Sequence, residues 1–516
     1  MKNKIINGLS LAVLLFSVWA CKEMDLNPHD QLAEGTFWKT ESDAQLALTG
    51  IYDQLKTNEP WGSDNFLNSF SLPALDALTD NAYTQHNRLG AKNAMATALN
   101  SQTSGVVTGF YGIAYKQIGA VNYFLENVDN VEAAAQKINQ WKGEALFFRG
   151  LMFYYLSEFY GDVPLVTSTY ALGDDLLPRS SKSEVVAQAI EDLDFAIANL
   201  EEKAYDGRVG KTAAQAIKAR VLMANQQWSA AAALTKEIME SGFFDLTPSF
   251  NSLFTAPEQE GNPEIIYSVR YLRPNEENFG SLNWGWWMSI SPLANFVDDF
   301  EMKNGLPITD PASGYDPENP YANRDPRLSL TVDHPGSVFG FAGENGGEDI
   351  MWSDRIQYLP PPLMYNLRKY ADRTFQASVD ASNHCDTDYV VLRFAEVLLN
   401  YAEAQNEVVG PDASVYEAIN KVRSRVEMPD IPSGLSQSEM RATIRHERRV
   451  ELAFEGIRWL DLKRWGKLVE RVSTIDETQV PVPYMISINN DLWPLPQSEV
   501  DFYSANGLEL GQNPGY

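Results

Sequence analysis

Cysteine is scarce in this sequence, which contains only Cys21 and Cys385 among its 516 residues. This scarcity excludes the class of small secreted proteins that are held together by several disulfides. Packing must therefore stabilise the fold, and an apolar content of 44% is ample for a core. At this length the chain forms roughly two to four domains, or one large one.

Basic residues are too few to balance the acidic ones. The chain carries 41 Lys and Arg against 69 Asp and Glu, which gives a formal net charge of -28 at pH 7. This charge would repel a polyanion such as nucleic acid unless a local basic patch opposed it. We identify no such patch in the sequence, and we expect no nucleic-acid partner.

Two familiar motifs begin in the sequence but are not completed. His446 and Glu447 open a zinc-protease pattern, but Val450 stands where the second His is required. The run 210–212, Gly-Lys-Thr, resembles the end of a phosphate-binding loop, but Tyr205 stands where the first Gly is required. A Gly-x-Ser-x-Gly nucleophile elbow does not occur in the sequence.

The stretch from His384 to Asp388 combines His, Cys and Asp side chains in a short space. Its spacing matches neither the usual zinc pattern nor the usual calcium pattern. We therefore expect no metal site and no cofactor. We expect Asp386 or Asp388 to cap a helix that begins near Leu392 instead.

Long hydrophobic runs are missing as well. The run from Leu9 to Ala20 follows Lys2 and Lys4 and has 12 residues, whereas a membrane-spanning helix needs about 20. Residues 1–20 are therefore predicted to be a signal peptide. The sequence 18–21, Val-Trp-Ala-Cys, resembles a bacterial lipobox, although its Trp is bulkier than the usual residue.

The lipobox predicts that Cys21 receives lipid and becomes the first mature residue. Cys385 would then be the only other thiol, so no intramolecular disulfide could form in the mature chain. A lipid anchor without a membrane-spanning helix predicts a protein attached to a membrane surface, with its body in water.

Helical periodicity dominates what the sequence does contain. A capped helix is expected from Thr40 towards Lys56, and apolar and aromatic residues recur at helical spacing over four further stretches, 105–128, 131–160, 181–200 and 212–242. Helices are predicted again from Leu392 and over 415–426. Three similar segments, 144–156, 215–228 and 395–408, suggest stacked helix pairs of the tetratricopeptide kind, although no strict repeat can be traced.

The predicted fold is therefore mainly α, with tetratricopeptide-like helix pairs forming a scaffold. The helical frame covers about 36–242 and 388–470, and a loop-rich insertion with a few short strands covers about 243–387. Residues 265–271 are the clearest strand candidate. We expect an irregular C-terminal tail, from Leu492 onward, to lie across the body.

The stretch 435–466 is predicted to be one helix. Ser436 and Glu439 form a capping box, and Gly456 implies a close approach to another segment. Five charged residues follow one another at three- or four-residue spacing, which predicts ion pairs along one edge: Arg448, Glu451, Glu455, Arg458 and Asp461. Paired carboxylates stay ionised, so these residues favour a scaffold over acid–base chemistry.

Seven segments together resemble the SusD/RagB-like outer-membrane lipoproteins in order and spacing. They are the lipobox and residues 158–164, 299–305, 323–328, 393–399, 435–466 and 512–516. The resemblance implies a single SusD-like domain over residues 21–516, with four tetratricopeptide-like helix pairs and a loop-rich face. It also implies a lipid-anchored protein of the outer membrane, at the cell surface, that is not an enzyme. Such a protein binds oligosaccharides, or peptides in the RagB branch, and delivers them to a SusC-like TonB-dependent barrel.

Sugars present flat C–H faces as well as hydroxyl groups, so a sugar site needs exposed aromatic rings with polar groups around them. Aromatic residues that lie outside helical periodicity and beside Gly or Asn are the candidates: Trp61, Tyr83, Trp284, Trp286 and Trp287. The polar candidates in the same loops are Asp80, Asn81, His86 and Asn283. Trp352 is a reserve candidate, and three helical tryptophans are expected to pack inside: Trp141, Trp459 and Trp465.

Three alternatives remain open at this point. Trp284 and Trp286 can instead form a small core under the insertion while Trp287 faces outward. A glycoside hydrolase on a helical frame would need two opposed carboxylates about 5–10 Å apart, and the sequence does not exclude such a pair. A purely structural adaptor would bind a barrel partner and no small ligand.

Overall fold

The computed structural model describes residues 37–56, 71–84, 105–171, 173–278, 280–340, 351–371, 385–484 and 491–516. Helices dominate these ranges, and the described strands are short and paired two by two. The mainly α prediction is therefore confirmed. None of the described helices has both the length and the apolar character that crossing a membrane requires.

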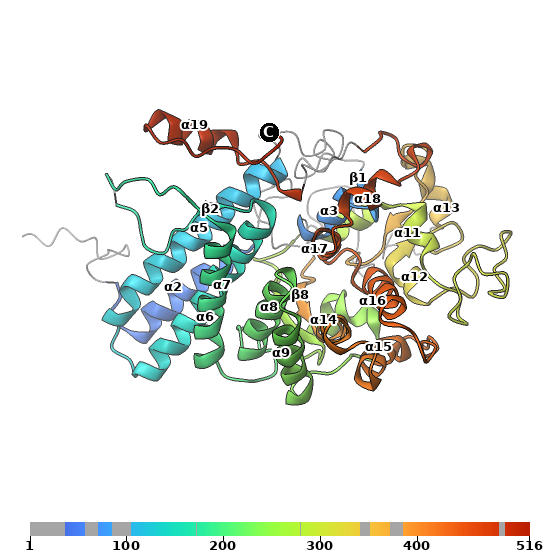
Figure 1. Cartoon of the computed structure of the whole chain (residues 1–516), viewed down its shortest axis with the longest axis horizontal. Coiled ribbons are helices and arrows are strands. Elements are labelled where there is room, and N and C mark those ends of the chain that lie inside the picture. The colour runs from blue at the N-terminus through green and yellow to red at the C-terminus, as the bar shows by residue number, and fades with distance from the viewer. Residues whose placement is uncertain are drawn as a thin grey trace, which may run out of the picture.

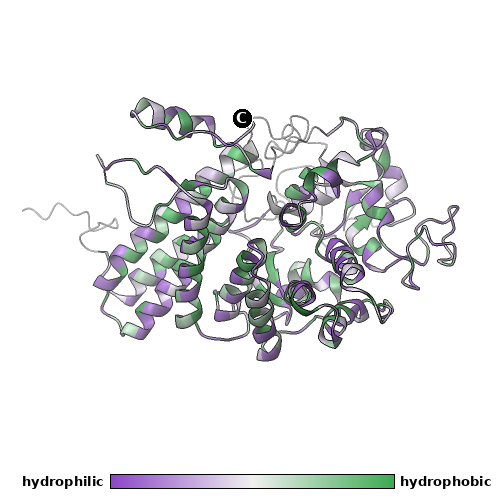
Figure 2. Cartoon of the chain, viewed as in Figure 1, coloured by the Kyte–Doolittle hydropathy of each residue, from purple (hydrophilic) through white to green (hydrophobic). Residues whose placement is uncertain are grey.

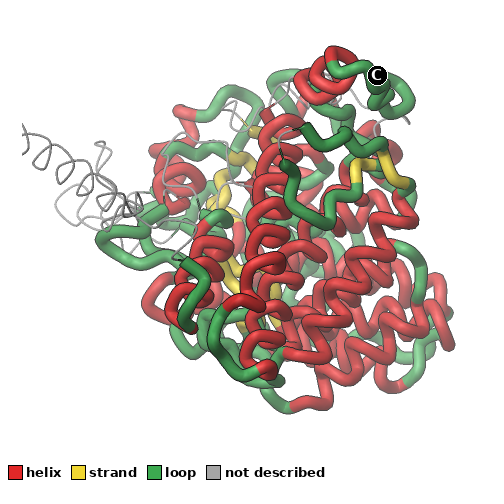
Figure 3. Tube along the Cα trace, turned by 90° about the vertical axis from the view of Figure 1, so that its left-hand side faces the viewer, coloured by secondary structure: helices red, strands yellow, loops and turns green. Residues whose placement is uncertain are grey.

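Six helices build the first part of the frame. They are α2 (Glu41–Asp53), α5 (Gly105–Asn127), α6 (Ala135–Phe159), α7 (Lys182–Asn199), α8 (Lys211–Ala224) and α9 (Trp228–Ser241). From α5 to α9 each helix packs against the next one in the chain, and α2 packs against both α5 and α6. Figure 3 shows this array from the side, with helices lying next to one another.

The helix starts follow the sequence signals where capping residues are present. Thr40 and Asp43 form the capping box of α2, and Ser181 and Glu184 form that of α7. The predicted single helix over 212–242 is wrong, because the chain turns between α8 and α9, where Gln226 has a positive φ of 56°. That turn produces the antiparallel pair that a stacked repeat requires.

Three further helices complete the frame: α14 (Phe394–Val409), α15 (Ala413–Arg425) and α16 (Gln437–Leu452). Helix α14 packs against α9 on one side and against α15 and α16 on the other, which joins the two parts of the frame. In Figure 2, several helices of the frame carry hydrophobic residues on one side and hydrophilic residues on the other. This amphipathic pattern is typical of helices that bury one face.

Short strands connect the remaining segments to the frame. The strand β4 (Ile265–Val269) pairs antiparallel with β8 (Tyr389–Arg393), and β1 (Ala82–Thr84) pairs with β5 (Ile290–Pro292). Two more pairs are β2 (Val163–Pro164) with β3 (Arg179–Ser180), and β6 (Val332–Asp333) with β7 (Asn366–Leu367). The strand predicted within 265–271 is thus confirmed.

Strand β8 corrects the prediction for Asp386 and Asp388. Residues 389–393 form that strand, so α14 begins only at Phe394, and its N-cap residue Arg393 makes no side-chain capping bond. Asp388 instead accepts a hydrogen bond from the backbone N–H of Tyr271 at 2.9 Å. Neither aspartate caps the helix.

Besides the short strands given above, the described residues between β4 and β8 form only short helical elements. They are the π-helical turn η5 (Ser281–Trp286), α11 (Ala294–Asp298), α12 (Arg327–Thr331), α13 (Trp352–Arg355) and η7 (Ile356–Tyr358). Other short segments are α3 (Ser71–Leu75), η1 (Asp76–Leu78), η3 (Val128–Asn130), η4 (Phe250–Leu253), α10 (Ala256–Gln259), α17 (Arg458–Arg464), α18 (Leu468–Ser473) and η8 (Glu477–Gln479). Figure 1 labels α11, α12, α13, α17 and α18 in the part of the molecule around α16.

The prediction of one helix over 435–466 is wrong. Ser436 and Glu439 do form the capping box of α16, but the chain leaves the helix after Leu452 and resumes one in α17. Two positive φ values, 64° at Phe454 and 76° at Gly456, interrupt it. Glycine adopts such a conformation without strain, so Gly456 serves a turn between two helices.

The tail after residue 490 contains a helix, α19 (Gln497–Ala505), which the prediction of an irregular tail missed. The tail does lie across the body, because the Trp493 ring stacks on Phe159 with ring centroids 4.2 Å apart. Asn513 Nδ2 donates to the carbonyl oxygens of Tyr160 and Trp493 at 2.8 and 2.7 Å. These contacts fix the two ends of α19 near the end of α6.

Candidate functional site

Asp80 and Asn81 are two of the polar candidates for the sugar site, and the structure argues against that role. Both are completely buried. Asp80 accepts from Arg458 Nε at 2.9 Å and from Arg471 Nε at 2.8 Å. Burial raises the pKa of Asp80, but Arg449 and Arg458 lower it more, so the net pKa lies well below its usual range. Asn81 links Asp76 to Arg449, so both side chains hold the scaffold.

Tyr83, Asn283, Trp284 and the reserve candidate Trp352 are buried too. Tyr83 lies in β1 and makes an edge contact with Tyr484, with ring centroids 6.2 Å apart. Asn283 and Trp284 lie inside η5 and have no exposed surface. Trp352 donates from Nε1 to the carbonyl oxygen of Met364 at 2.8 Å. A ligand on the surface cannot reach these four side chains.

Trp286 and Trp287 are the predicted aromatic residues that remain partly exposed. One face of Trp286 is covered, since the Arg355 guanidinium lies 4.0 Å from the ring centroid. In the alternative, Trp284 and Trp286 form a small core while Trp287 faces outward. Trp284 is buried and Trp287 is partly exposed, as that alternative requires, but Trp286 is partly exposed as well. Trp61, His86 and Cys21 lie outside the described residues.

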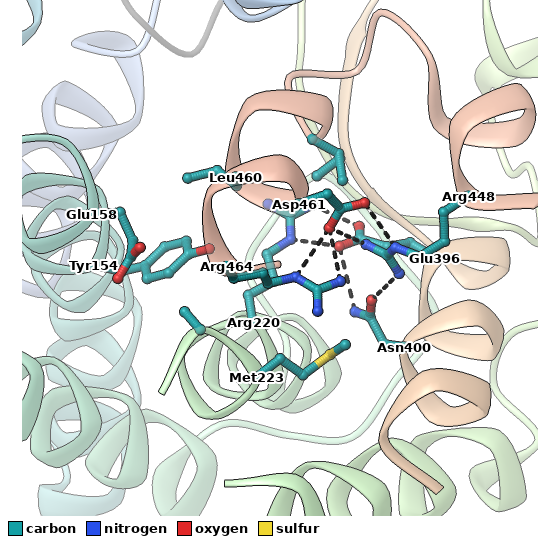
Figure 4. Close-up of a pocket in the computed structure, with 12 residues that line it drawn as sticks. Tyr154, Glu158, Arg220, Met223, Glu396, Asn400, Arg448, Leu460, Asp461 and Arg464 are labelled. Atoms are coloured by element: carbon teal, nitrogen blue, oxygen red, sulfur yellow. Dashed lines mark hydrogen bonds and ion pairs between the residues drawn. The ribbon is translucent and has the colours of Figure 1, made fainter. Parts of the chain in front are cut away.

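Figure 4 shows a cluster of charged side chains that forms a structural network. It surrounds a cavity of only about 20 Å³, room for a water molecule and no more. Arg220 binds Glu396 through two bonds of 2.7 and 2.6 Å, and Arg448 binds Asp461 at 2.8 and 2.9 Å. Asp461 also accepts from Arg464 at 2.8 Å. Every charged group drawn there has an ion-pair partner, and that of Glu158 is Lys182, at 2.8 Å. The charges of this cluster are therefore engaged within the protein.

Glu451 and Glu455 belong to a similar network, but their partners differ from the prediction. Arg393 of β8 binds Glu451 at 2.6 Å and Glu455 at 2.6 Å, and Lys369 binds Glu455 at 2.6 Å. Burial raises the pKa of Glu451, yet Arg425 and Arg393 bring it well below its usual range. The prediction that both carboxylates stay ionised is confirmed, whereas pairing along one helix edge is wrong.

An open groove of about 1000 Å³ is lined by residues of the described part of the chain. We name it the tyrosine groove. It lies between α5, residues 164–171 and 173–176 at and after the end of β2, and α19, which Figure 1 shows above the upper end of α5. Its aromatic lining consists of Tyr111, Tyr115, Tyr123, Tyr170, Phe502 and Tyr503.

Three of these rings present large surfaces to solvent. Tyr123 is 39% exposed, Tyr170 46% and Phe502 52%. Tyr111 and Tyr115 form the floor, with ring centroids 4.8 Å apart, and the Tyr115 hydroxyl donates to the carbonyl oxygen of Pro164 at 2.7 Å. Fixed rings below and exposed rings at the sides make a concave aromatic surface.

Polar groups surround these rings, and none of the described lining residues is Lys or Arg. Ser168, Thr169, Asp174, Glu499 and Asn506 supply hydroxyl, carboxyl and amide groups. Burial raises the pKa of Glu499. Aromatic faces with a few polar groups and no cation suit a neutral, hydroxyl-rich ligand better than an anionic one.

Two glycines of α5 leave the floor of the groove open. A Cβ atom added at Gly112 or Gly119 would meet no atom within 4 Å. Together with Tyr111, Tyr115 and Tyr123, Gly119 lies on one face of α5, because these positions follow one another at intervals of four residues. This face was not predicted, because the aromatic candidates were sought only outside helical periodicity.

Comparison with known families identifies the architecture. The family model described as the SusD family matches residues 254–516, which is half of the chain. The chain belongs to the SusD family. A second model, described as starch-binding and associating with the outer membrane, matches residues 40–223.

Individual members of the SusD family match over nearly the whole length. SusD-like protein P25 of Formosa agariphila is 28% identical, with 92% of each chain covered. SusD-like protein P2 of the same organism is 25% identical and covers 98% of this chain and 99% of its own. The crystal structure of a SusD-like carbohydrate-binding protein of Bacteroides fragilis is 26% identical, with a TM-score of 0.79 over 90% of this chain and 99% of that one.

Proposed function

We propose that this SusD-family protein is a cell-surface lipoprotein that binds oligosaccharides and hands them to a SusC-like TonB-dependent transporter. The lipobox supports attachment to the outer membrane through lipid on Cys21. Membership of the SusD family supports a glycan ligand and the barrel partner. The protein works by binding and release, and it is not an enzyme.

One observation carries the assignment of a ligand site. The tyrosine groove combines exposed rings with polar groups, has no described basic lining residue, and is of the size that ligand sites have in proteins. Stacking of sugar C–H faces on Tyr123, Tyr170 and Phe502 would remove apolar surface from water. The polar groups at the edge would then fix the orientation of the sugar hydroxyls.

Trp286 and Trp287 remain a second candidate surface for the glycan. Both are partly exposed, and Tyr358 beside them is 58% exposed. Arg355 lies between Trp286 and Tyr358, 4.0 and 5.0 Å from their ring centroids. Because the guanidinium covers part of this surface, we place it second.

Filling the groove tests the proposal without removing any native contact. Gly119→Leu places a side chain in the open space above α5, and leucine favours a helix more than glycine does by roughly 0.8–1 kcal/mol. We expect the variant to fold at least as stably as the parent and to bind glycans at least tenfold more weakly. Isothermal titration of the chain from residue 22, against a panel of neutral oligosaccharides and peptides, measures this change.

Gly50→Leu is the matched control. Gly50 is an exposed helical glycine of α2, and an added Cβ there also meets no atom within 4 Å. It should bind glycans like the parent. Unchanged glycan affinity in Gly119→Leu would remove the groove from the proposal, and binding of peptides alone would assign the protein to the RagB-like branch. Release of shortened sugars from a bound glycan would support the glycoside hydrolase instead.

A further inference from the structure

A second cavity, of about 250 Å³, lies between α16, α17 and α18 on the right of Figure 1. We name it the basic cavity. Five cationic side chains line it, against the carboxylates of Asp299 and Glu470: Arg445, Arg449, Arg458, Lys467 and Arg471. In a chain with a net charge of -28 this local excess of positive charge is unusual, and the sequence analysis did not find it.

Four of the five cations have acidic partners. Asp80, which does not itself line the cavity, forms ion pairs with Arg458 and Arg471 at 2.8 Å each and with Arg449 at 3.3 Å. Arg449 also pairs with Asp299, and Lys467 pairs with Glu470 at 2.5 Å. Three carboxylates therefore pair with four cations, and Arg445 has none, so positive charge remains uncompensated in the cavity.

Arg445 is the lining cation for which no ion pair or hydrogen bond occurs with any described residue, and its Nε is buried without an acceptor. The nearest acidic groups on the α14 side are occupied. Glu403 accepts from Arg464 at 2.5 and 2.6 Å, and Glu407 accepts from Arg441 at 2.5 and 2.7 Å. A buried guanidinium N–H without an acceptor costs free energy unless a ligand or water satisfies it.

Arg445 is also held in place. Its guanidinium lies 4.7 Å from the centroid of the Trp465 ring, and Trp465 is fixed in turn by a 2.7 Å hydrogen bond from its Nε1 to Glu403. A planar guanidinium held over an aromatic ring directs its N–H groups outward in its own plane, where they match the two oxygens of a carboxylate or sulfate.

We propose that the basic cavity binds an oxyanion, a carboxylate or a sulfate, with Arg445 as the principal donor. The volume admits a group no larger than one sugar acid. The oxyanion can arrive as a free ion or as the acidic substituent of a saccharide, and the chemistry that the cavity recognises is the same. This site lies apart from the tyrosine groove, which has no described basic lining residue, and it does not depend on the glycan assignment of that groove.

The test is calorimetric titration of the chain from residue 22 in low-salt buffer, with three probes. Sodium glucuronate carries a carboxylate on a sugar ring, glucose is its neutral counterpart, and sodium sulfate is a free oxyanion. We expect saturable binding of glucuronate and none of glucose. Arg445→Gln should weaken that binding at least tenfold, and Arg445→Lys should weaken it as well, because the charge is kept but the two-pronged donor is lost.

Two variants make the result specific. Lys303→Gln removes the same charge from an exposed lysine that pairs with Glu427, and it should leave glucuronate affinity unchanged. Gly119→Leu should also leave glucuronate affinity unchanged while weakening neutral glycan binding at least tenfold, so failure of either proposal can be recognised separately. Thermal unfolding checks that the Arg445 variants remain folded.

The outcomes divide clearly. Equal binding of sulfate and glucuronate supports an oxyanion site for free ions, and preference for glucuronate supports an acidic saccharide as its source. Absence of saturable binding to both anions overturns the proposal. Binding that survives Arg445→Gln in a folded protein overturns it too.

Discussion

The charged interior around α16 and the tyrosine groove are opposite kinds of region. In the interior, Glu451 and Arg393 are buried, carry full charges and satisfy one another. In the groove, Tyr123, Tyr170 and Phe502 are apolar surfaces that remain exposed although burial would be favourable. The buried charged residues therefore hold the scaffold together, and the exposed aromatic rings of the groove provide a surface that a ligand can cover.

This difference follows from what each residue type gains by finding a partner. A buried charge without a partner strongly destabilises the folded state, so the charges of a stable interior are paired. An exposed aromatic ring lowers the stability of the fold only slightly, so it can remain at the surface and be available to a ligand. The following predictions test this distinction, from the largest expected effect to the smallest.

Breaking the charged interior should have the largest effect. Glu451→Gln leaves Arg393 and Arg425 facing a neutral side chain in a site with no exposed surface. We expect the free energy of unfolding to fall by about 3–5 kcal/mol, as when one partner of a buried ion pair is removed. Urea denaturation measures this loss.

The control is the exposed pair of Lys236 and Glu240, whose side chains are 57% and 67% exposed. Glu240→Gln should change the free energy of unfolding by less than about 0.5 kcal/mol. Similar losses in the two variants would mean that the buried network does not carry the scaffold.

Asp76 shows what happens to a buried carboxylate that lacks an arginine bonded to it. It accepts a bond of 2.7 Å from Asn81 Nδ2, and its Oδ2 has no partner among the described residues. Burial raises its pKa to about 7. The folded protein therefore holds a proton that the unfolded chain releases near pH 4, and stability should fall as pH rises from about 4 to 7.

Asp76→Asn should remove this pH dependence. At pH 8 the variant should be more stable than the parent, by at most about 4 kcal/mol for a shift of this size, and at pH 4 the difference should be small. Thermal unfolding measured from pH 4 to 8 checks the slope. Equal slopes for parent and variant would show that Asp76 is ionised throughout this range.

The sequence allowed the scaffold to be predicted because its signals are local. Capping boxes at Thr40, Ser181 and Ser436 fixed helix starts within one residue. The break at Phe454 and Gly456 was missed because apolar spacing continues across it, and only tertiary contacts impose the positive φ values. Burial of Asp80 was missed for the same reason, since its arginine partners lie more than 360 residues away in the chain.

The candidate site was harder to predict because exposure is not encoded locally. Trp284, Trp286 and Trp287 look equivalent in sequence, yet one is buried and two are partly exposed. The tyrosines of α5 have the spacing of core residues, and the tail helix α19 determines that a groove lies over them. A helix face that combines Tyr115, Gly119 and Tyr123 was the one available signal.

Removing single rings of the groove should have a moderate effect on binding and a small one on folding. Tyr170→Ala and Phe502→Ala each remove an exposed aromatic face. We expect each substitution to weaken glycan binding by about 1 kcal/mol or more, the usual threshold for an important contact. The free energy of unfolding should change by less than about 0.5 kcal/mol. Titration and urea denaturation of the same samples separate the two quantities.

The smallest effect is expected at the second aromatic surface. Arg355 already occupies one face of Trp286, so a sugar there would have to displace the guanidinium or use the remaining edge. Trp287→Ala should therefore change glycan affinity by less than Phe502→Ala does, in the same titration. A larger loss from Trp287→Ala, in a protein that remains folded, would reverse the order of the two surfaces and make the tryptophans the principal glycan site.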